Sequence, residues 1–362
     1  MKKIIVNLKD RSYAIVVGHH ILSKLGAMVA ALEIGSDAII ITNHLVRKLY
    51  GPQVKNIFSK RKISVKFFEA PDSERSKSER VAFRLIESIA RYDVQKKIFI
   101  VALGGGVIGD LAGFVAAIYK RGVPLVQVPT TLLAQIDSAI GGKVAIDLPM
   151  AKNLVGAFYQ PKLVFSDVAV LKTLDVRQIK NGLAEAVKYG IIKDKPLFAY
   201  LERNYNKILS SNPQSLSTIV ERCSRIKARI VEKDERDTLG LRTILNFGHT
   251  IGHGVEAAGA YDYYQHGEAI ALGMRMAAAI SSELDLLSSA ERQRIEALLT
   301  RIGLPQKIKN VDASLVIRSI AHDKKNASKK NRFVLIKRIG CVKIVDGVPL
   351  RLIQKILQEY SA

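Results

Sequence analysis

Residues 98–113 of the 362-residue chain read IFIVALGGGVIGDLAG, and this stretch decides the fold class. Its first half is an apolar run with the length of a buried strand. The glycines that follow fit the spacing GxGxxG, and the sequence after them continues as an apolar helix. A strand, a glycine turn and a helix in this order are typical of an α/β unit with a parallel sheet.

The same alternation continues on both sides of this stretch. Two short runs, 2–6 and 13–17, indicate an opening hairpin, and further strands are predicted at 38–42, 65–68, 125–128 and 163–166, with an amphipathic helix at 76–91. From about Val176 helical patterns such as 216–233 and 289–302 dominate. We predict an α/β N-terminal domain (1–174) with a mostly parallel, Rossmann-like sheet, a mainly α-helical C-terminal domain (175–362), and an active site in the cleft between them.

Composition and cysteine usage indicate a cytoplasmic protein without a membrane partner. Cys223 and Cys341 are far apart and lack a CxxC spacing, so neither a disulfide framework nor a thiolate metal site is expected. The longest mostly apolar stretch, 101–118, contains Asp110 and several glycines, which argues against a membrane span. The N-terminal run is broken by polar residues, unlike a signal peptide.

The formal net charge of +23 attracts anions. A nucleic-acid-binding protein would cluster basic and aromatic residues on one element or contain a recognisable reading motif, and the sequence has neither. Its basic residues are spread along the chain, although 301–343 is notably basic. We therefore expect a solvated basic surface that helps to attract a small phosphorylated substrate, and no nucleic-acid partner.

The glycine turn at 104–109 is a candidate nucleotide site. Glycines allow close approach of a pyrophosphate, and the following helix N-terminus offers unpaired N–H groups. An ordinary Rossmann fingerprint lies in the first βα unit and has an acidic ribose ligand about 20 residues later, where this chain reads Tyr119-Lys120-Arg121. A standard Rossmann dehydrogenase is thus disfavoured, and a non-standard site would take its ribose contact from around Thr42-Asn43.

Histidines and a carboxylate indicate a metal site. His249 and His253 are four residues apart, on one face of a helix, and His266 follows nearby. Glu185 and Lys188 place an acid and a base three residues apart in an apolar segment, where a buried charge needs a partner. A carboxylate with two or three imidazoles leaves open positions on a divalent ion, as catalytic zinc requires.

Lysines beside glycines indicate an anion pocket. Lys143 follows Gly141-Gly142, as in phosphate-binding loops, and other polar residues follow it at Asp147, Lys152 and Asn153. Further positive charge is expected from Lys227, Arg242 and the run Asp323-Lys324-Lys325. A substrate with both a phosphate and a carboxylate would account for so many bases.

Six segments together resemble the 3-dehydroquinate synthase family of sugar phosphate cyclases, in the family's order and over nearly the whole chain. They are GGGVIGDLAGFVAAIYKRG (104–122), VPTTLLAQIDSAIGGKVAID (128–147), KNLVGAFYQP (152–161), LAEAVKYG (183–190), ERDTLGLRTILNFGHTIGHGVE (235–256) and HGEAIALGM (266–274). The resemblance implies two domains, bound NAD, a zinc ion with cobalt as an alternative, and commonly a homodimer. It also implies a lyase that converts 3-deoxy-arabino-heptulosonate 7-phosphate to dehydroquinate and phosphate.

The same resemblance assigns roles to individual residues. The implied metal ligands are Glu185, His249 and His266, and His253 assists proton transfer near the substrate. Substrate hydroxyls would contact Asp137, Lys188 and Asn246, and the carboxylate would contact Lys227 and Arg242. The implied phosphate contacts are Lys143, Asn153, Arg121 acting on the neighbouring subunit, and Lys324 or its neighbour Lys325. The implied NAD contacts are Asn43, Glu74, Lys77, Gly105, Gly106, Val107, Asp110, Thr130, Thr131, Lys143, Lys152 and Thr173.

Asn43 departs from the family pattern, since many members have an aspartate on the adenosine ribose at this position. Asparagine still forms hydrogen bonds but lacks the charge, which bears on the preference for NAD over NADP. Two rival enzymes are considered. Other sugar phosphate cyclases change the GGK and KN segments, whereas this chain keeps Lys143, Lys152 and Asn153. A metal-dependent polyol dehydrogenase of related fold would release NADH.

Overall fold

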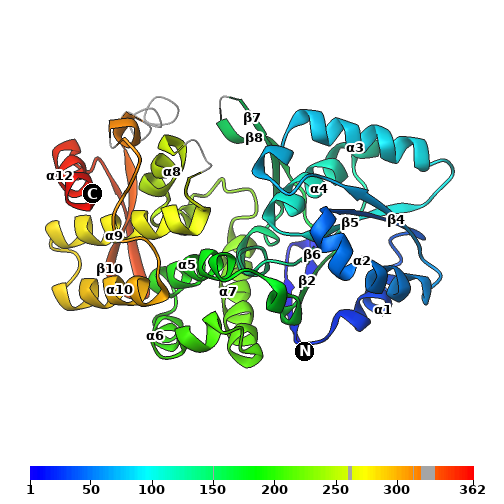
Figure 1. Cartoon of the computed structure of the whole chain (residues 1–362), viewed down its shortest axis with the longest axis horizontal. Coiled ribbons are helices and arrows are strands. Elements are labelled where there is room, and N and C mark those ends of the chain that lie inside the picture. The colour runs from blue at the N-terminus through cyan, green and yellow to red at the C-terminus, as the bar shows by residue number, and fades with distance from the viewer. Residues whose placement is uncertain (150, 260–262, 313, 319–330) are drawn as a thin grey trace. The chain divides into compact units, whose positions relative to one another are not determined.

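The computed structural model describes residues 1–149, 151–259, 263–312, 314–318 and 331–362 (Figure 1). The chain forms two compact units, the first of 1–174 with 216–236 and the second of 175–215 with 237–362. Helix α7 (Pro213–Lys233) thus lies mostly in the first unit. There Ser224 Oγ donates a hydrogen bond to the backbone oxygen of Gln135. The domain boundaries and the cleft expected from the sequence stay predictions.

The first unit contains the predicted sheet, in which every neighbouring pair except the first is parallel. The order is β1 (Lys2–Val6), β2 (Tyr13–Gly18), β9 (Leu163–Asp167), β6 (Leu125–Pro129), β5 (Ile98–Gly104), β3 (Asp37–Thr42) and β4 (Ser64–Glu69). The mostly parallel α/β architecture expected from the sequence is therefore confirmed. It brings the carboxyl ends of β3, β4, β5 and β6 to one edge, where ligands of such sheets bind.

Helices cover both faces of this sheet. Helices α1 (Leu25–Ala30) and α2 (His44–Ser59) share one core with Ala38 and Ile40 of β3, whereas α3 (Glu79–Tyr92) and α4 (Gly106–Ile118) share the other with Ile39 and Ile41. Burial on both faces explains why β3 and β5 are continuous apolar runs. The helix expected from residue 76 begins at Glu79, because Ser78 caps it and 74–76 form a 3₁₀ turn.

A β-hairpin follows Gly141-Gly142, in the place where the sequence indicated a loop that carries lysines. Its strands are β7 (Lys143–Leu148) and β8 (Ala151–Phe158), paired antiparallel. Gly156 allows the close approach, since a side chain there would overlap the backbone oxygen of Val144. Lys143 and Asn153 therefore lie on strands.

The second unit is mainly helical, as predicted. Its long helices are α5 (Val176–Ile192), α6 (Lys195–Leu209), α8 (His249–Ala258), α9 (His266–Glu283), α10 (Ser289–Ile302) and α12 (Leu350–Tyr360). Helix α9 is buried along most of its length. A hairpin of β10 (Arg332–Arg338) and β11 (Cys341–Asp346), which the sequence did not indicate, packs on α9.

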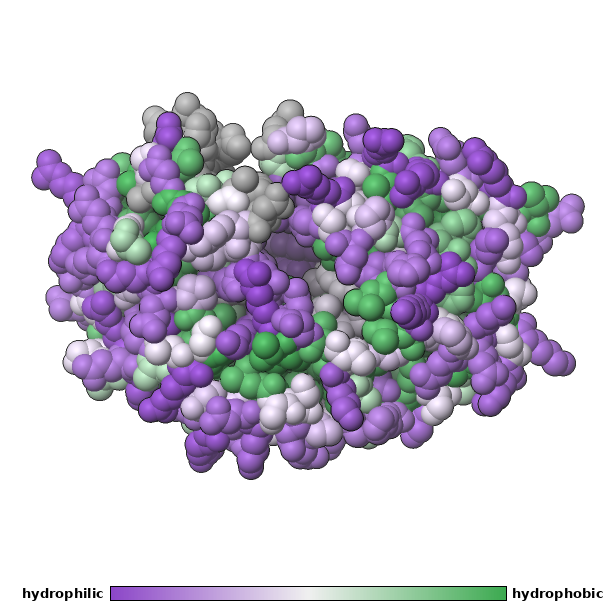
Figure 2. Space-filling view, in the orientation of Figure 1, coloured by the Kyte–Doolittle hydropathy of each residue, from purple (hydrophilic) through white to green (hydrophobic). Residues whose placement is uncertain are grey.

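Surface character agrees with the charged composition. On the face shown in Figure 2 hydrophilic residues predominate, and hydrophobic residues form small groups among them. Within the described part of the chain, none of the helices combines the length and the apolar character needed to cross a bilayer.

Candidate active site

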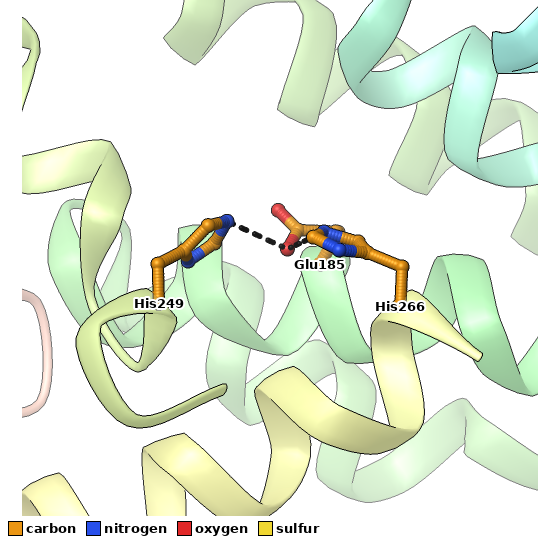
Figure 3. Close-up of side chains that lie close together, drawn as sticks. All are labelled: Glu185, His249 and His266. Atoms are coloured by element: carbon orange, nitrogen blue, oxygen red, sulfur yellow. Dashed lines mark ion pairs between the residues drawn. The ribbon is translucent and has the colours of Figure 1, made fainter. Parts of the chain in front are cut away.

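Three side chains from three helices meet in the second unit (Figure 3). Glu185, fully buried on α5, lies between the imidazoles of His249 and His266. Its Oε1 is 3.7 Å from Nε2 of His249 and 3.5 Å from Nε2 of His266. The structure thus brings together the three residues that the sequence suggested as metal ligands.

Close helix packing positions these three residues. His249 is the first residue of α8 and follows Gly248, whose φ of 79° favours glycine. A side chain at Gly273 of α9 would overlap the carbonyl oxygen of Gly248, so α8 and α9 approach each other through glycines. Asn181 of α5 accepts a hydrogen bond from the backbone N–H of Gly267, next to His266.

A capping network fixes the start of α9. Glu268 accepts a hydrogen bond of 2.9 Å from the backbone N–H of Gln265. The same carboxylate accepts two hydrogen bonds of 2.7 Å from Arg177 of α5. The first interaction closes the α9 N-terminus on itself, and the bonds from Arg177 hold that terminus, with the backbone of His266, against α5.

The three ligand atoms fit a divalent cation. Ligands at about 2.0–2.2 Å from a tetrahedral ion are roughly 3.4 Å from one another. The Glu185–histidine separations of 3.5 and 3.7 Å are close to this value, and all three atoms lie within 4.8 Å of one another. Two imidazoles and one carboxylate are a donor set that zinc accepts with positions left for water or substrate.

The two imidazoles differ in their proton affinity. Burial, followed by the nearby Lys188 ammonium, lowers the pKa of His249 well below its ordinary value. Burial also opposes protonation of His266, but hydrogen bonds to Glu185 and Glu256 outweigh it and raise its pKa to about 10. Of the two rings, that of His266 therefore binds a proton more readily.

Four further predicted residues lie in this unit. Lys188 is buried and forms an ion pair with Glu185. The His253 side chain is 60% exposed, and its ring centroid is 5.1 Å from that of His249. Arg242 is buried and Asn246 exposed in the 3₁₀ segment η7 (Leu241–Asn246), which leads to His249.

The glycine turn lies in the first unit, at the carboxyl end of β5. Gly105 is the N-cap of α4 and has no side chain to cap the helix. The backbone N–H groups of Gly106 and Val107, at the start of α4, can therefore bind an anion. Thr130 donates its backbone N–H to Gly104, and a Cβ at Gly105 would lie 3.0 Å from the Thr131 methyl group. The five expected NAD contacts Gly105, Gly106, Val107, Thr130 and Thr131 therefore lie together at the carboxyl ends of β5 and β6.

Five other predicted residues form a polar network near this turn. The buried Lys77 Nζ donates to Asp110 Oδ2 (2.8 Å) and to Asn153 Oδ1 (2.5 Å). Glu74 lies 3.8 Å from Lys77 and 3.4 Å from Lys152. Burial raises the pKa of the Asp110 carboxyl, and the Lys77 ammonium opposes that shift.

Asn43 follows β3 and caps α2, because its Oδ1 accepts a hydrogen bond from the backbone N–H of Val46. Its amide donates a 2.8 Å hydrogen bond to Asp72, an exposed carboxylate in the loop after β4. The carboxylate of Asp72 thus supplies a negative charge directly beside Asn43, whose own side chain is uncharged. Sequence analysis did not single out Asp72, because its contact with Asn43 depends on the pairing of β3 with β4.

The remaining predicted residues lie in several places. Lys227 of α7 donates to the backbone oxygen and to Oδ1 of Asp137, both at 2.7 Å. Lys143 lies over the Phe158 ring, Thr173 shares a hydrogen bond with Tyr50, and Arg121 lies in a turn with a φ of 65°. Lys324 and Lys325 lie outside the described residues.

Comparison with known proteins gives the same family along the chain. A family model described as 3-dehydroquinate synthase N-terminal matches residues 67–181, and one described as 3-dehydroquinate synthase C-terminal matches 182–326. The 3-dehydroquinate synthase of Desulforamulus reducens is 43% identical over 96% of this chain and 97% of its own length.

Solved structures of sugar phosphate cyclases share the fold. A 2-epi-5-epi-valiolone synthase from Streptomyces hygroscopicus, with NAD⁺ and Zn²⁺ bound, matches 98% of both chains with a TM-score of 0.89 and 28% identity. A 2-deoxy-scyllo-inosose synthase complexed with carbaglucose-6-phosphate, NAD⁺ and Co²⁺ matches 99% of this chain and all of that one, with a TM-score of 0.89 and 27% identity. Since the family models together cover most of the chain and the sequence identity extends over nearly its full length, this chain belongs to the 3-dehydroquinate synthase family.

Proposed function

We propose that the protein converts 3-deoxy-arabino-heptulosonate 7-phosphate to 3-dehydroquinate and phosphate, as a step of the shikimate pathway in the cytoplasm. The observation that carries the proposal is the convergence of Glu185, His249 and His266, which fits a divalent cation. Zinc is the proposed ion, cobalt an alternative and NAD the proposed cofactor. The proposed assembly is a homodimer, in which Arg121 would act on the substrate of the neighbouring subunit.

The proposed reaction uses residues of both units. When bound, NAD would accept and return a hydride, and the cation would polarise the oxygen of the hydroxyl group whose carbon is oxidised. Lys188, Asn246 and Asp137 would hold substrate hydroxyls. His253 is exposed and can transfer a proton at its imidazole nitrogen. Positive charge for the carboxylate would come from Lys227 and Arg242, and for the phosphate from Lys143, Lys324 and the Asn153 amide.

Phosphate release without accumulation of NADH is the expected result when protein, zinc and catalytic NAD are incubated with the heptulosonate phosphate. The cofactor is reduced and reoxidised within each turnover, so absorbance at the NADH band should stay flat while phosphate accumulates. Stoichiometric NADH would instead indicate a polyol dehydrogenase. Turnover of a different sugar phosphate, with none of the heptulosonate phosphate, would indicate another cyclase.

Asp72→Asn should reduce the preference for NAD over NADP by about tenfold. A carboxylate beside the ribose accepts from its hydroxyls and repels the 2′-phosphate of NADP, and a tenfold ratio corresponds to about 1.4 kcal/mol. Dissociation constants of both dinucleotides, measured by titration, check this directly. An unchanged ratio would show that Asp72 does not contact the ribose.

A further inference from the structure

A second carboxylate, that of Glu256, lies beside the His266 ring on the side away from Glu185. Glu256 lies on α8, one turn beyond His253, and its side chain is only 8% exposed. Its Oε1 is 3.4 Å from Nδ1 of His266, and its Oε2 is 3.9 Å from Nε2 of His253. Neither the spacing of the histidines nor the family resemblance singled out this residue.

The two nitrogens of His266 consequently face two different carboxylates. Nε2 faces Glu185 at 3.5 Å and Nδ1 faces Glu256 at 3.4 Å. In His249 the corresponding Nδ1 faces a neutral acceptor, the backbone oxygen of Phe247, at 3.1 Å. An imidazole that binds a metal through one nitrogen usually donates its other N–H to an oxygen, which fixes the tautomer and the ring orientation.

We propose that Glu256 is a positioning residue of the metal centre: its carboxylate accepts a hydrogen bond from Nδ1–H of His266 and thereby directs the Nε2 lone pair at the cation beside Glu185. The inference rests on the proposed metal site. The two imidazoles then have different hydrogen-bond acceptors at Nδ1, a backbone carbonyl for His249 and a carboxylate for His266. Glu256 and Glu185 together place two negative charges beside the divalent ion in a largely buried place, where the Lys188 ammonium also pairs with Glu185.

The alternative is a second cation held by His253, Glu256 and His266, whose ligand atoms also lie within 4.8 Å of one another. Two cations would require His266 to give up both of its ring protons. The exposed His253 also lies farther from Glu256 than His266 does, at 3.9 against 3.4 Å. The geometry therefore favours one cation and a hydrogen bond from Nδ1.

The test uses metal-free full-length protein and zinc competition with a chromophoric chelator. Glu256→Gln keeps an acceptor but removes the charge and should weaken zinc binding by about tenfold, whereas Glu256→Ala should approach 100-fold. Both variants should bind one ion per chain. The control is Glu283→Gln, which changes the last residue of α9, a carboxylate that pairs with Lys355, and which should bind zinc within about twofold of the unsubstituted protein.

Each outcome decides a different point. Unchanged zinc affinity in Glu256→Gln, or an equal loss in Glu283→Gln, overturns the positioning role. A second ion per chain that disappears in Glu256→Gln makes Glu256 a ligand. If the unsubstituted protein binds no zinc, the proposed metal site itself fails. Nitrogen NMR of zinc-bound His266 needs no variant: a protonated Nδ1 and a metal-bound Nε2 are expected, and the reverse assignment refutes the proposal.

Discussion

His249→Ala is expected to remove the metal and nearly all turnover while the fold is retained. The variant deletes one of three ligand atoms. Losing a residue that only supports a metal ligand already weakens metal binding by up to about 100-fold, so zinc affinity should fall by more than that here. Losing several kcal/mol of transition-state stabilisation corresponds to about three orders of magnitude in rate. Metal analysis after dialysis and the phosphate-release assay measure both effects.

His253→Ala is the matched control, because His253 lies on the same helix one turn later and its ring is near that of His249. It should keep one zinc ion per chain and lose turnover alone, since its proposed role is proton transfer. If His253→Ala loses the metal and His249→Ala keeps it, the ligand assignment is wrong.

Gly273→Ala is expected to cause the largest loss of stability. The added methyl group would overlap the carbonyl oxygen of Gly248, and because backbone meets backbone there, α8 and α9 must move apart. Overpacking commonly costs about 1–3 kcal/mol, and this site should reach at least the top of that range. For a chain of 362 residues, about 3 kcal/mol corresponds to a decrease in Tm of roughly 4 °C or more. Zinc affinity should fall as well, since α8 carries His249 and α9 carries His266.

Gly259→Ala is the control for this substitution. A Cβ at Gly259 would meet its nearest neighbours at 3.4 Å, which is ordinary van der Waals contact, and its φ of −88° suits any residue. Thermal unfolding followed by circular dichroism should show little change for this variant. Equal Tm values for Gly273→Ala and the unsubstituted protein would contradict the close helix packing described above.

The parallel sheet could be predicted because both of its faces are covered. Strands such as β3 and β5 are then continuous apolar runs, whose length distinguishes them from helices. The hairpin β7–β8 was missed although Val144 and Ile146 alternate with more exposed residues, because the glycines before Lys143 favoured a loop. The exposed strand β8 gave a weaker pattern than the buried ones.

The sequence could predict that His249 and His253 lie side by side, since a spacing of four residues places them on one face of a helix. Spacing could not show which imidazole faces Glu185, because the start of α8 at Gly248 and the contact with α9 decide this. A signal for Glu256 was present, as it lies seven residues after His249 and three after His253, on the same face. No local pattern could have placed Asp72 beside Asn43.

The proposed metal centre consists of one divalent ion held by Glu185, His249 and His266. Anomalous diffraction at the zinc edge, from crystals of the protein grown with zinc, locates this ion. One peak per chain is expected, about 2.0–2.2 Å from Nε2 of both histidines and from a carboxylate oxygen of Glu185. A peak coordinated by His253 and Glu256 instead, with none at Glu185, would contradict this assignment.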